Sequence, residues 1–75
     1  MAIISGTAVN SDGSKIDGTA TVSTSWNSNK AYPRNGLFTL DLGSNPRSTI
    51  MVYLDGMEAT SVYVDGHATV HLVRR

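Results

Sequence analysis

Cysteine is absent from the chain, and this excludes two reinforcements that small domains commonly use. Without cysteine there is neither a disulfide framework nor a thiolate metal site, and two histidines alone do not complete a structural zinc shell. A single domain of 75 residues buries only roughly 60% of the surface of its unfolded chain, so its stability is expected to be a few kcal/mol. Since assembly with other chains is the remaining common reinforcement, we expect a multi-copy or homo-oligomeric protein.

An excess of charge of either sign is also absent, because six Lys and Arg balance six Asp and Glu. The basic side chains are scattered except for a pair at the end, so we expect no nucleic acid partner. No apolar run approaches the roughly 18 residues of a membrane span, and the segment "MAIISGTAVNS" lacks a basic region before an apolar one. We therefore expect no membrane partner, no cleaved secretion signal, and synthesis in a reducing cytoplasm.

Strong helix formers are sparse, and short turn motifs recur between runs of period two. The pattern predicts one all-β domain over residues 1–75, a small antiparallel β-sandwich of six to seven strands. The expected strands are residues 2–9, 18–26, 36–42, 48–55, 58–64 and 67–73, with a short extended piece at 30–33.

Alternation within each expected strand assigns one face to the core. The expected core rows are Ile4, Gly6 and Ala8; Ala20, Val22, Thr24 and Trp26; Phe38, Leu40 and Leu42; Ile50, Val52 and Leu54; Thr60, Val62 and Val64; and Ala68, Val70 and Leu72.

Catalytic constellations are missing as well. There is no GxSxG elbow, no glycine-rich phosphate loop and no pair of catalytic carboxylates, so we expect a protein that is not an enzyme and binds no cofactor. His67 and His71 are four residues apart. In a strand this spacing separates them by about 13 Å, too far for one metal to bridge, so we expect two solvent-side histidines.

Four aspartates lie one or two residues from a glycine: Asp12, Asp17, Asp55 and Asp65. Carboxylates in loops can bind calcium, but Asp-Gly is also the preferred sequence of tight turns, because both residues tolerate positive φ. No segment matches the "DxDxDG…E" calcium loop, so we expect turn geometry and no metal site.

Three segments carry a family resemblance: "ISGTAVNSDGSKIDGTATVS", "NGLFTLDL" and "TIMVYLDGM". Together they resemble the carboxypeptidase-regulatory-like (transthyretin-like, Ig-like) β-sandwich. Within that group, the pattern is most similar to the N-terminal domain of lambdoid-phage tail-fibre proteins, which also begin with "ISG" close to the start methionine. The resemblance implies a virion protein.

The resemblance leads to an expected function within the virion. We expect a phage structural protein, most simply a capsid decoration (cement) protein that contacts other virion proteins of the capsid or tail. A tail or fibre-associated module is the alternative within this class. Because the sequence ends at Arg75 where a fibre would continue into a shaft, we expect a stand-alone module.

Several apolar residues fall on the parity expected to face solvent, and they are the candidate protein-contact residues. They are Leu37, Met51, Tyr53, Tyr63 and Val73. If their strands are neighbours they form an apolar patch, unless the segment at residues 1–3 covers it or strand bulges change the parity. Arg74 and Arg75 are further candidates, since their guanidinium groups can pair with carboxylates of a neighbouring subunit.

A competing class of function uses a different part of the chain. Trp26 and Tyr32 flank the polar segment "WNSNKAYPRNG" and would form a carbohydrate-binding or cell-surface-binding loop. Trp26 also lies on the core parity, where it is expected to cap the end of the sandwich. A third possibility keeps the fold but places it in a cellular protein as an accessory domain.

Overall fold

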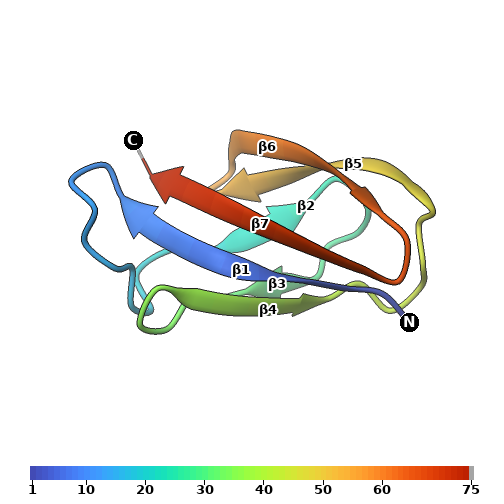
Figure 1. The fold of residues 1–75 in the computed structure, drawn as a ribbon, viewed down its shortest axis with the longest axis horizontal. Helices are drawn as coiled ribbons and strands as arrows, with labels where there is room; N and C mark the ends of the chain where they lie inside the picture. The colour runs from blue at the N-terminus through green and yellow to red at the C-terminus, as the bar shows by residue number, and fades with distance from the viewer. Residues whose placement is uncertain (75) are drawn as a thin grey trace.

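The computed structural model describes residues 1–74, which form two β-sheets and no helix, so none that could cross a membrane (Figure 1). The strands are β1 (Ile3–Asn10), β2 (Val22–Thr24), β3 (Lys30–Ala31), β4 (Leu37–Asp41), β5 (Ser48–Leu54), β6 (Met57–Val64) and β7 (His67–Arg74). A three-stranded sheet has the order β4-β1-β7, and a four-stranded sheet has the order β3-β2-β5-β6. The expectation of an all-β domain with two layers is confirmed.

The core lies between the two sheets and is built from the alternating residues of each strand. Phe38, Leu40 and Leu42 are buried, and so are Ile50, Val52 and Leu54, as the period-two pattern predicts. Val62 and Val70 are only half-buried, because they lie on the edge strands β6 and β7, where each sheet ends.

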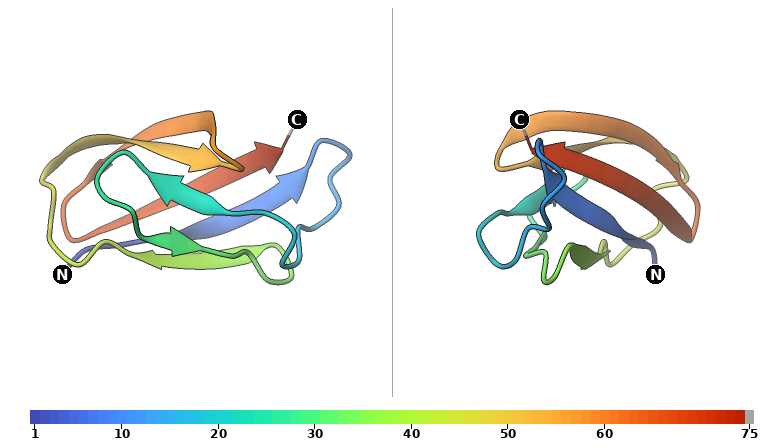
Figure 2. Two further views of the ribbon diagram at one scale, coloured as in Figure 1. Left: turned by 180° about the vertical axis from the view of Figure 1, so that it is seen from behind. Right: turned by 60° about the vertical axis from the view of Figure 1, so that its left-hand side comes forward.

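The first strand occupies the middle of the three-stranded sheet (Figure 2). It pairs with β4 in the antiparallel sense and with β7 in the parallel sense. The expectation of a wholly antiparallel sandwich is therefore wrong at this pair. Each connection between consecutive strands reverses the direction of the chain. The first and the seventh strand therefore run in the same direction, so their pairing has to be parallel.

Close packing around the central strand explains one glycine. A Cβ atom on Gly6 would lie 1.8 Å from the carbonyl oxygen of Val70 in β7, so only glycine fits this position in β1.

The second expected strand is shorter than the sequence indicated. Residues 18–21 belong to a loop, and only Val22–Thr24 form a strand. Gly18 has a φ of +75°, and its N–H donates to the carbonyl of Pro33 at 2.6 Å. The N–H of Thr21 donates to the Asp55 carboxylate at 3.1 Å. The N–H groups of Gly18 and Thr21 are therefore not used for pairing with a neighbouring strand. The extended piece expected at 30–33 forms the short strand β3 at its first two residues.

The β5–β6 hairpin carries the only register shift recorded between paired strands of residues 1–74. Asp55 and Gly56 close the hairpin with φ values of +55° and +78°, the geometry of a two-residue turn with positive φ. Val52 pairs with Thr60 while Tyr53 pairs with Glu58, which leaves Ala59 as the extra residue of a β-bulge. From Thr60 to Val64 the strand alternates regularly.

Candidate contact surfaces

The off-parity apolar residues lie on two opposite surfaces and do not form one row. Leu37 of β4 and Val73 of β7 belong to the outer face of the three-stranded sheet. They do not touch as strand neighbours, because β1 runs between them and its Thr7 pairs with both Leu37 and His71. Leu37 is 60% exposed and pairs with the polar residue Thr7, so the single patch envisaged from the sequence is divided in two.

The outer face of the four-stranded sheet holds the other three residues, Met51, Tyr53 and Tyr63. We call them the Tyr–Met stripe. Met51 and Tyr53 are half-buried on β5, while Tyr63 on β6 is 60% exposed. Met51 pairs directly with Ser61, which places Tyr63 on the diagonal to Met51, within reach of a long side chain. The stripe therefore runs obliquely over two neighbouring strands.

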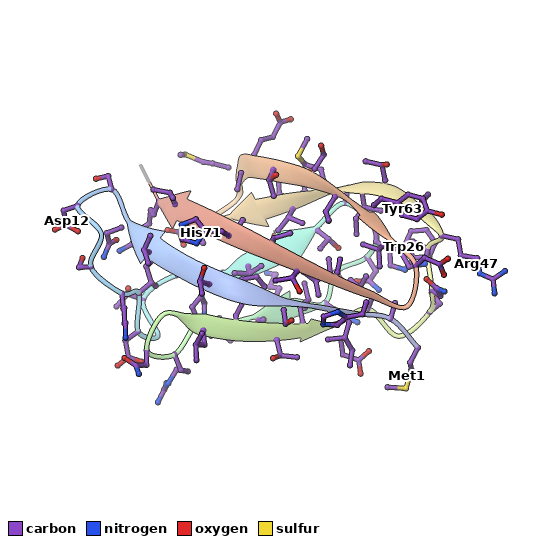
Figure 3. The ribbon with its side chains drawn as sticks, in the orientation of Figure 1. Met1, Asp12, Trp26, Arg47, Tyr63 and His71 are labelled. Carbon is purple, nitrogen blue, oxygen red and sulfur yellow. The ribbon has the colours of Figure 1, made fainter. Side chains whose placement is uncertain are left out.

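The stripe is not covered by the chain itself. The N-terminal segment runs along the other sheet, where Ile3 begins β1 and pairs with Asp41. Met1 is exposed at the end of the molecule (Figure 3). The bulge at Ala59 lies N-terminal to Ser61 and Tyr63, so it does not alter their parity. The Tyr–Met stripe faces solvent.

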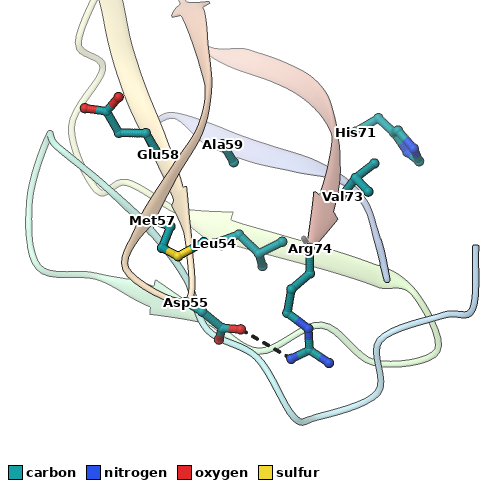
Figure 4. Close-up of a pocket in the computed structure, with 8 residues that line it drawn as sticks. All are labelled: Leu54, Asp55, Met57, Glu58, Ala59, His71, Val73 and Arg74. Atoms are coloured by element: carbon teal, nitrogen blue, oxygen red, sulfur yellow. Dashed lines mark hydrogen bonds and ion pairs between the residues drawn. The ribbon is translucent and has the colours of Figure 1, made fainter. Parts of the chain in front are cut away.

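An open edge of the sandwich, not identified from the sequence, forms a second surface. The strands β6 and β7 are the last strands of their sheets on the same side of the molecule. A recess of about 350 Å³ lies between them (Figure 4). Its lining consists of Leu54, Asp55, Met57, Glu58, Ala59, His71, Val73 and Arg74. Met57, 59% exposed, is its most accessible large apolar side chain, and the bulge that positions it leaves no signature in the sequence.

The opposite edge of the sandwich, formed by β3 and β4, is closed by side chains and turns. The Asn27 amide donates to the carbonyl of Leu42 at 2.9 Å, and the Asn29 amide donates to that of Asp41 at 3.0 Å. The Arg34 N–H donates to the carbonyl of Leu37 at 2.8 Å. Side chains and a turn thus bond to backbone groups at both ends of β4, whereas within residues 1–74 no recorded hydrogen bond joins β6 to any strand other than β5.

Arg74 is engaged within the chain. Its Nε donates to Asn10 Oδ1 at 2.9 Å, and its Nη1 lies 3.3 Å from Asp55 Oδ2 and 3.4 Å from the carbonyl of Thr19. The guanidinium therefore links the end of β7 to the β5–β6 turn and to the loop before β2. Arg75 lies outside the described residues.

Replacing Arg74 by alanine is expected to lower the free energy of unfolding by about 1 kcal/mol, since it removes a partly buried ion pair and two further hydrogen bonds. Urea titration followed by tryptophan fluorescence would measure the change. Arg34→Ala is the matched control, because the Arg34–Asp17 pair at 3.5 Å is largely exposed and should contribute less than about 0.5 kcal/mol. Equal losses in the two variants would contradict the assigned role of Arg74.

The two aromatic residues of the alternative ligand loop are far apart. Trp26 follows the end of β2, and its Nε1 donates to Ser44 Oγ at 3.2 Å. Tyr32 follows β3, whose Ala31 pairs with Val22 at the start of β2. The two rings thus leave opposite ends of the hairpin. Trp26, expected in the core row of its strand, is instead 39% exposed, and its indole N–H ties it to the loop after β4.

The two histidines lie exposed on β7, as expected, and each meets a hydroxyl of β1. Ser5 Oγ is 3.0 Å from His67 Nε2, and Thr7 Oγ1 is hydrogen-bonded to His71 Nδ1. No group of three potential metal ligands is found among residues 1–74.

The aspartates beside glycine bond to nearby chain, as turn residues do. The hydroxyl and then the backbone N–H of Ser14 donate to Asp12 and hold the pKa of its carboxyl below the ordinary value. Asp17 accepts the N–H of Asn35 at 3.2 Å, and Asp65 accepts the amide of Asn45 at 2.9 Å. These carboxylates stabilise loops, and they are not gathered at one place.

Comparison with known proteins adds no assignment to these surfaces: no protein-family model, no curated protein and no solved structure matches the chain.

Proposed function

We propose that this chain is a structural protein that acts by protein–protein contact and has no enzymatic activity. The observation that carries the proposal is the Tyr–Met stripe, where Tyr63 stands 60% exposed beside Met51 on a face that alternation would make polar. Contiguous apolar side chains on the surface of a small protein are typical of contact sites, and tyrosine and methionine are enriched there.

The wider assignment is to a phage particle, with the protein made in the host cytoplasm and then bound to the capsid as a decoration protein. It is supported by the resemblance of the three quoted segments to the N-terminal domain of phage tail-fibre proteins. On the same grounds we propose that the two-layer fold is of the transthyretin-like, Ig-like type.

The mechanism follows from linkage. A domain of this size has a small margin of stability, and any partner that binds only the folded form adds to that margin. Burying the Tyr–Met stripe on neighbouring capsid subunits would stabilise the shell and the domain together. Neither a cofactor nor a metal takes part.

The test uses particles of the phage that encodes the chain, separated into empty heads and tails. The expected result is that the wild-type protein co-sediments with heads, and that Met51→Asp and Tyr53→Asp remove binding because each places a charge in the buried contact. Thr39→Asp is the matched control, since Thr39 is exposed on the outer face of the other sheet. Far-UV circular dichroism confirms that each variant is folded.

The outcomes separate the proposals. Undiminished binding of the folded Met51→Asp variant would show that the stripe is not the contact. Binding to tails alone would replace capsid decoration by a tail or fibre-associated role. Loss of binding in Tyr32→Asp and Trp26→Ala, but not in Met51→Asp, would instead support a ligand loop.

A further inference from the structure

The strand β6 is an unprotected sheet edge. Edge strands of natural proteins usually carry lysine, proline, a covering loop or a bulge, because their free N–H and C=O groups otherwise pair with another strand. Over Met57–Val64 there is no lysine, proline or glycine, and the bulge at Ala59 affects only the first residues. Five regularly alternating residues, 60–64, remain as a template for pairing.

The contrast with the other end of the same sheet is large. There the last strand is β3, which has only two residues, and the neighbouring β4 edge is capped by Asn27 and Asn29. The open edge also has exposed apolar groups at both ends of β6, Met57 and Tyr63. The chain therefore closes one side of the sandwich and leaves the other ready to pair.

We propose that the occupant of this edge is a second copy of the chain, whose β6 pairs with β6 in the antiparallel sense about a two-fold axis. The proposal rests on the contact function above and names one partner for it. The two four-stranded sheets would then form one continuous sheet, and the two Tyr–Met stripes would join on its outer face.

Charge favours the antiparallel sense over the parallel sense for two identical strands. Glu58 is the only charged residue of β6, and residues 59–64, which form the paired segment, are neutral. With the axis at Ser61 or Val62, the two Glu58 positions are six to eight residues apart, roughly 20 to 27 Å at the usual rise. This exceeds the Debye length of about 8 Å at physiological salt, whereas parallel pairing would set the two glutamates side by side.

The position of Ser61 follows from the pleat. A two-fold axis perpendicular to the sheet pairs outer residues with outer residues, so Ser61 faces either its own copy or Tyr63 of the other chain. The Cβ atoms of the two Ser61 residues are then about 5 Å apart in the first register, or on a diagonal of about 7 to 8 Å in the second. Either register brings the two Ser61 side chains together.

The expected affinity is low. A standard protein–protein interface buries about 800 Å² of the surface of each partner, which is close to a fifth of the 4276 Å² surface of this protein. Pairing along one strand edge buries a smaller area. Antiparallel pairing of β6 with β6 also brings Glu58 of one copy near Asp65 of the other, and the repulsion between these two carboxylates weakens the dimer. We therefore expect a weak and reversible dimer.

The experiment is sedimentation velocity of the isolated protein from about 10 µM to about 1 mM, a range in which a weak dimer forms as the concentration rises. Ser61→Lys and Ser61→Glu should each weaken dimerisation at least tenfold, because like charges face each other across the axis. An equimolar mixture of the two variants should restore the dimer. Thr39→Lys and Thr39→Glu are the matched controls, exposed on β4 at the closed edge, and should dimerise like the wild type.

A second measurement needs no variant. Amide hydrogen exchange of the wild type at the two ends of that concentration range should show slower exchange at 1 mM in residues 60–64 and no change in β4. A monomeric wild type at 1 mM, or a mixture of charge variants that stays monomeric, would overturn the proposal. Because no phage particle is present, a failure of the dimer proposal in these measurements can be distinguished from a failure of the proposed function in the co-sedimentation test.

Discussion

Gly6→Ala is expected to leave the chain unfolded at 25 °C. Gly6 lies in the middle of β1, the central strand of its sheet, and a Cβ atom there would stand 1.8 Å from the carbonyl oxygen of Val70 and 2.8 Å from its carbonyl carbon. Both contacts are with backbone, so the clash is relieved only by moving β7 away from β1. We expect a loss above about 4 kcal/mol, comparable to the whole stability of a domain this small.

Far-UV circular dichroism and a urea titration would measure this result. Gly43→Ala is the matched control. Gly6 and Gly43 both have positive φ, +154° and +76°, but nothing lies within 4 Å of the Cβ position of Gly43. Its cost should be limited to backbone strain of about 1 to 2 kcal/mol. A folded Gly6→Ala protein with a stability near that of Gly43→Ala would show that the β1–β7 pairing is not as close as described.

Leu40→Ala is expected to lower the free energy of unfolding by about 3 kcal/mol. The Leu40 side chain is buried between the sheets, and its residue pairs with Ile4 of the central strand. Shortening it removes apolar contacts and leaves a cavity between the two sheets, which typically costs about 2 to 5 kcal/mol.

Leu37→Ala in the same strand provides the control. Leu37 points outward and is 60% exposed, so its loss should change the free energy of unfolding by less than about 0.5 kcal/mol. Both variants can be followed by the fluorescence of Trp26 during urea unfolding. Similar costs at the two positions would contradict the inward and outward assignments of β4.

Much of the fold was predictable because local pattern and tertiary environment agree. In β4 the order of exposed and buried residues follows the sequence alternation from Leu37 to Asp41. The hairpin at Asp55-Gly56 was indicated by a dipeptide that tolerates two positive φ values. The parallel β1–β7 pair was missed. The local sequence of an edge strand such as β7 does not show whether its neighbour runs parallel or antiparallel to it.

The contact surfaces were only partly predictable. The sequence identified Leu37 and Tyr63 as apolar residues on the outward parity, and both are 60% exposed. It did not show that they lie on different sheets, which depends on the strand order. The recess beside Met57 was missed for a related reason: it depends on a bulge at Ala59 and on the proximity of β7.

By itself, the sequence determined which residues alternate, where the chain reverses and which apolar side chains point outward, because each of these depends on local backbone geometry and turn chemistry. Only the tertiary structure decided which strands are neighbours, that Gly6 must be a glycine, and that one edge of the sandwich is closed while β6 is open. These features depend on contacts between residues far apart in the chain. Strand neighbours are chosen by the packing of the whole core, and an edge is recognised only when every strand has been placed.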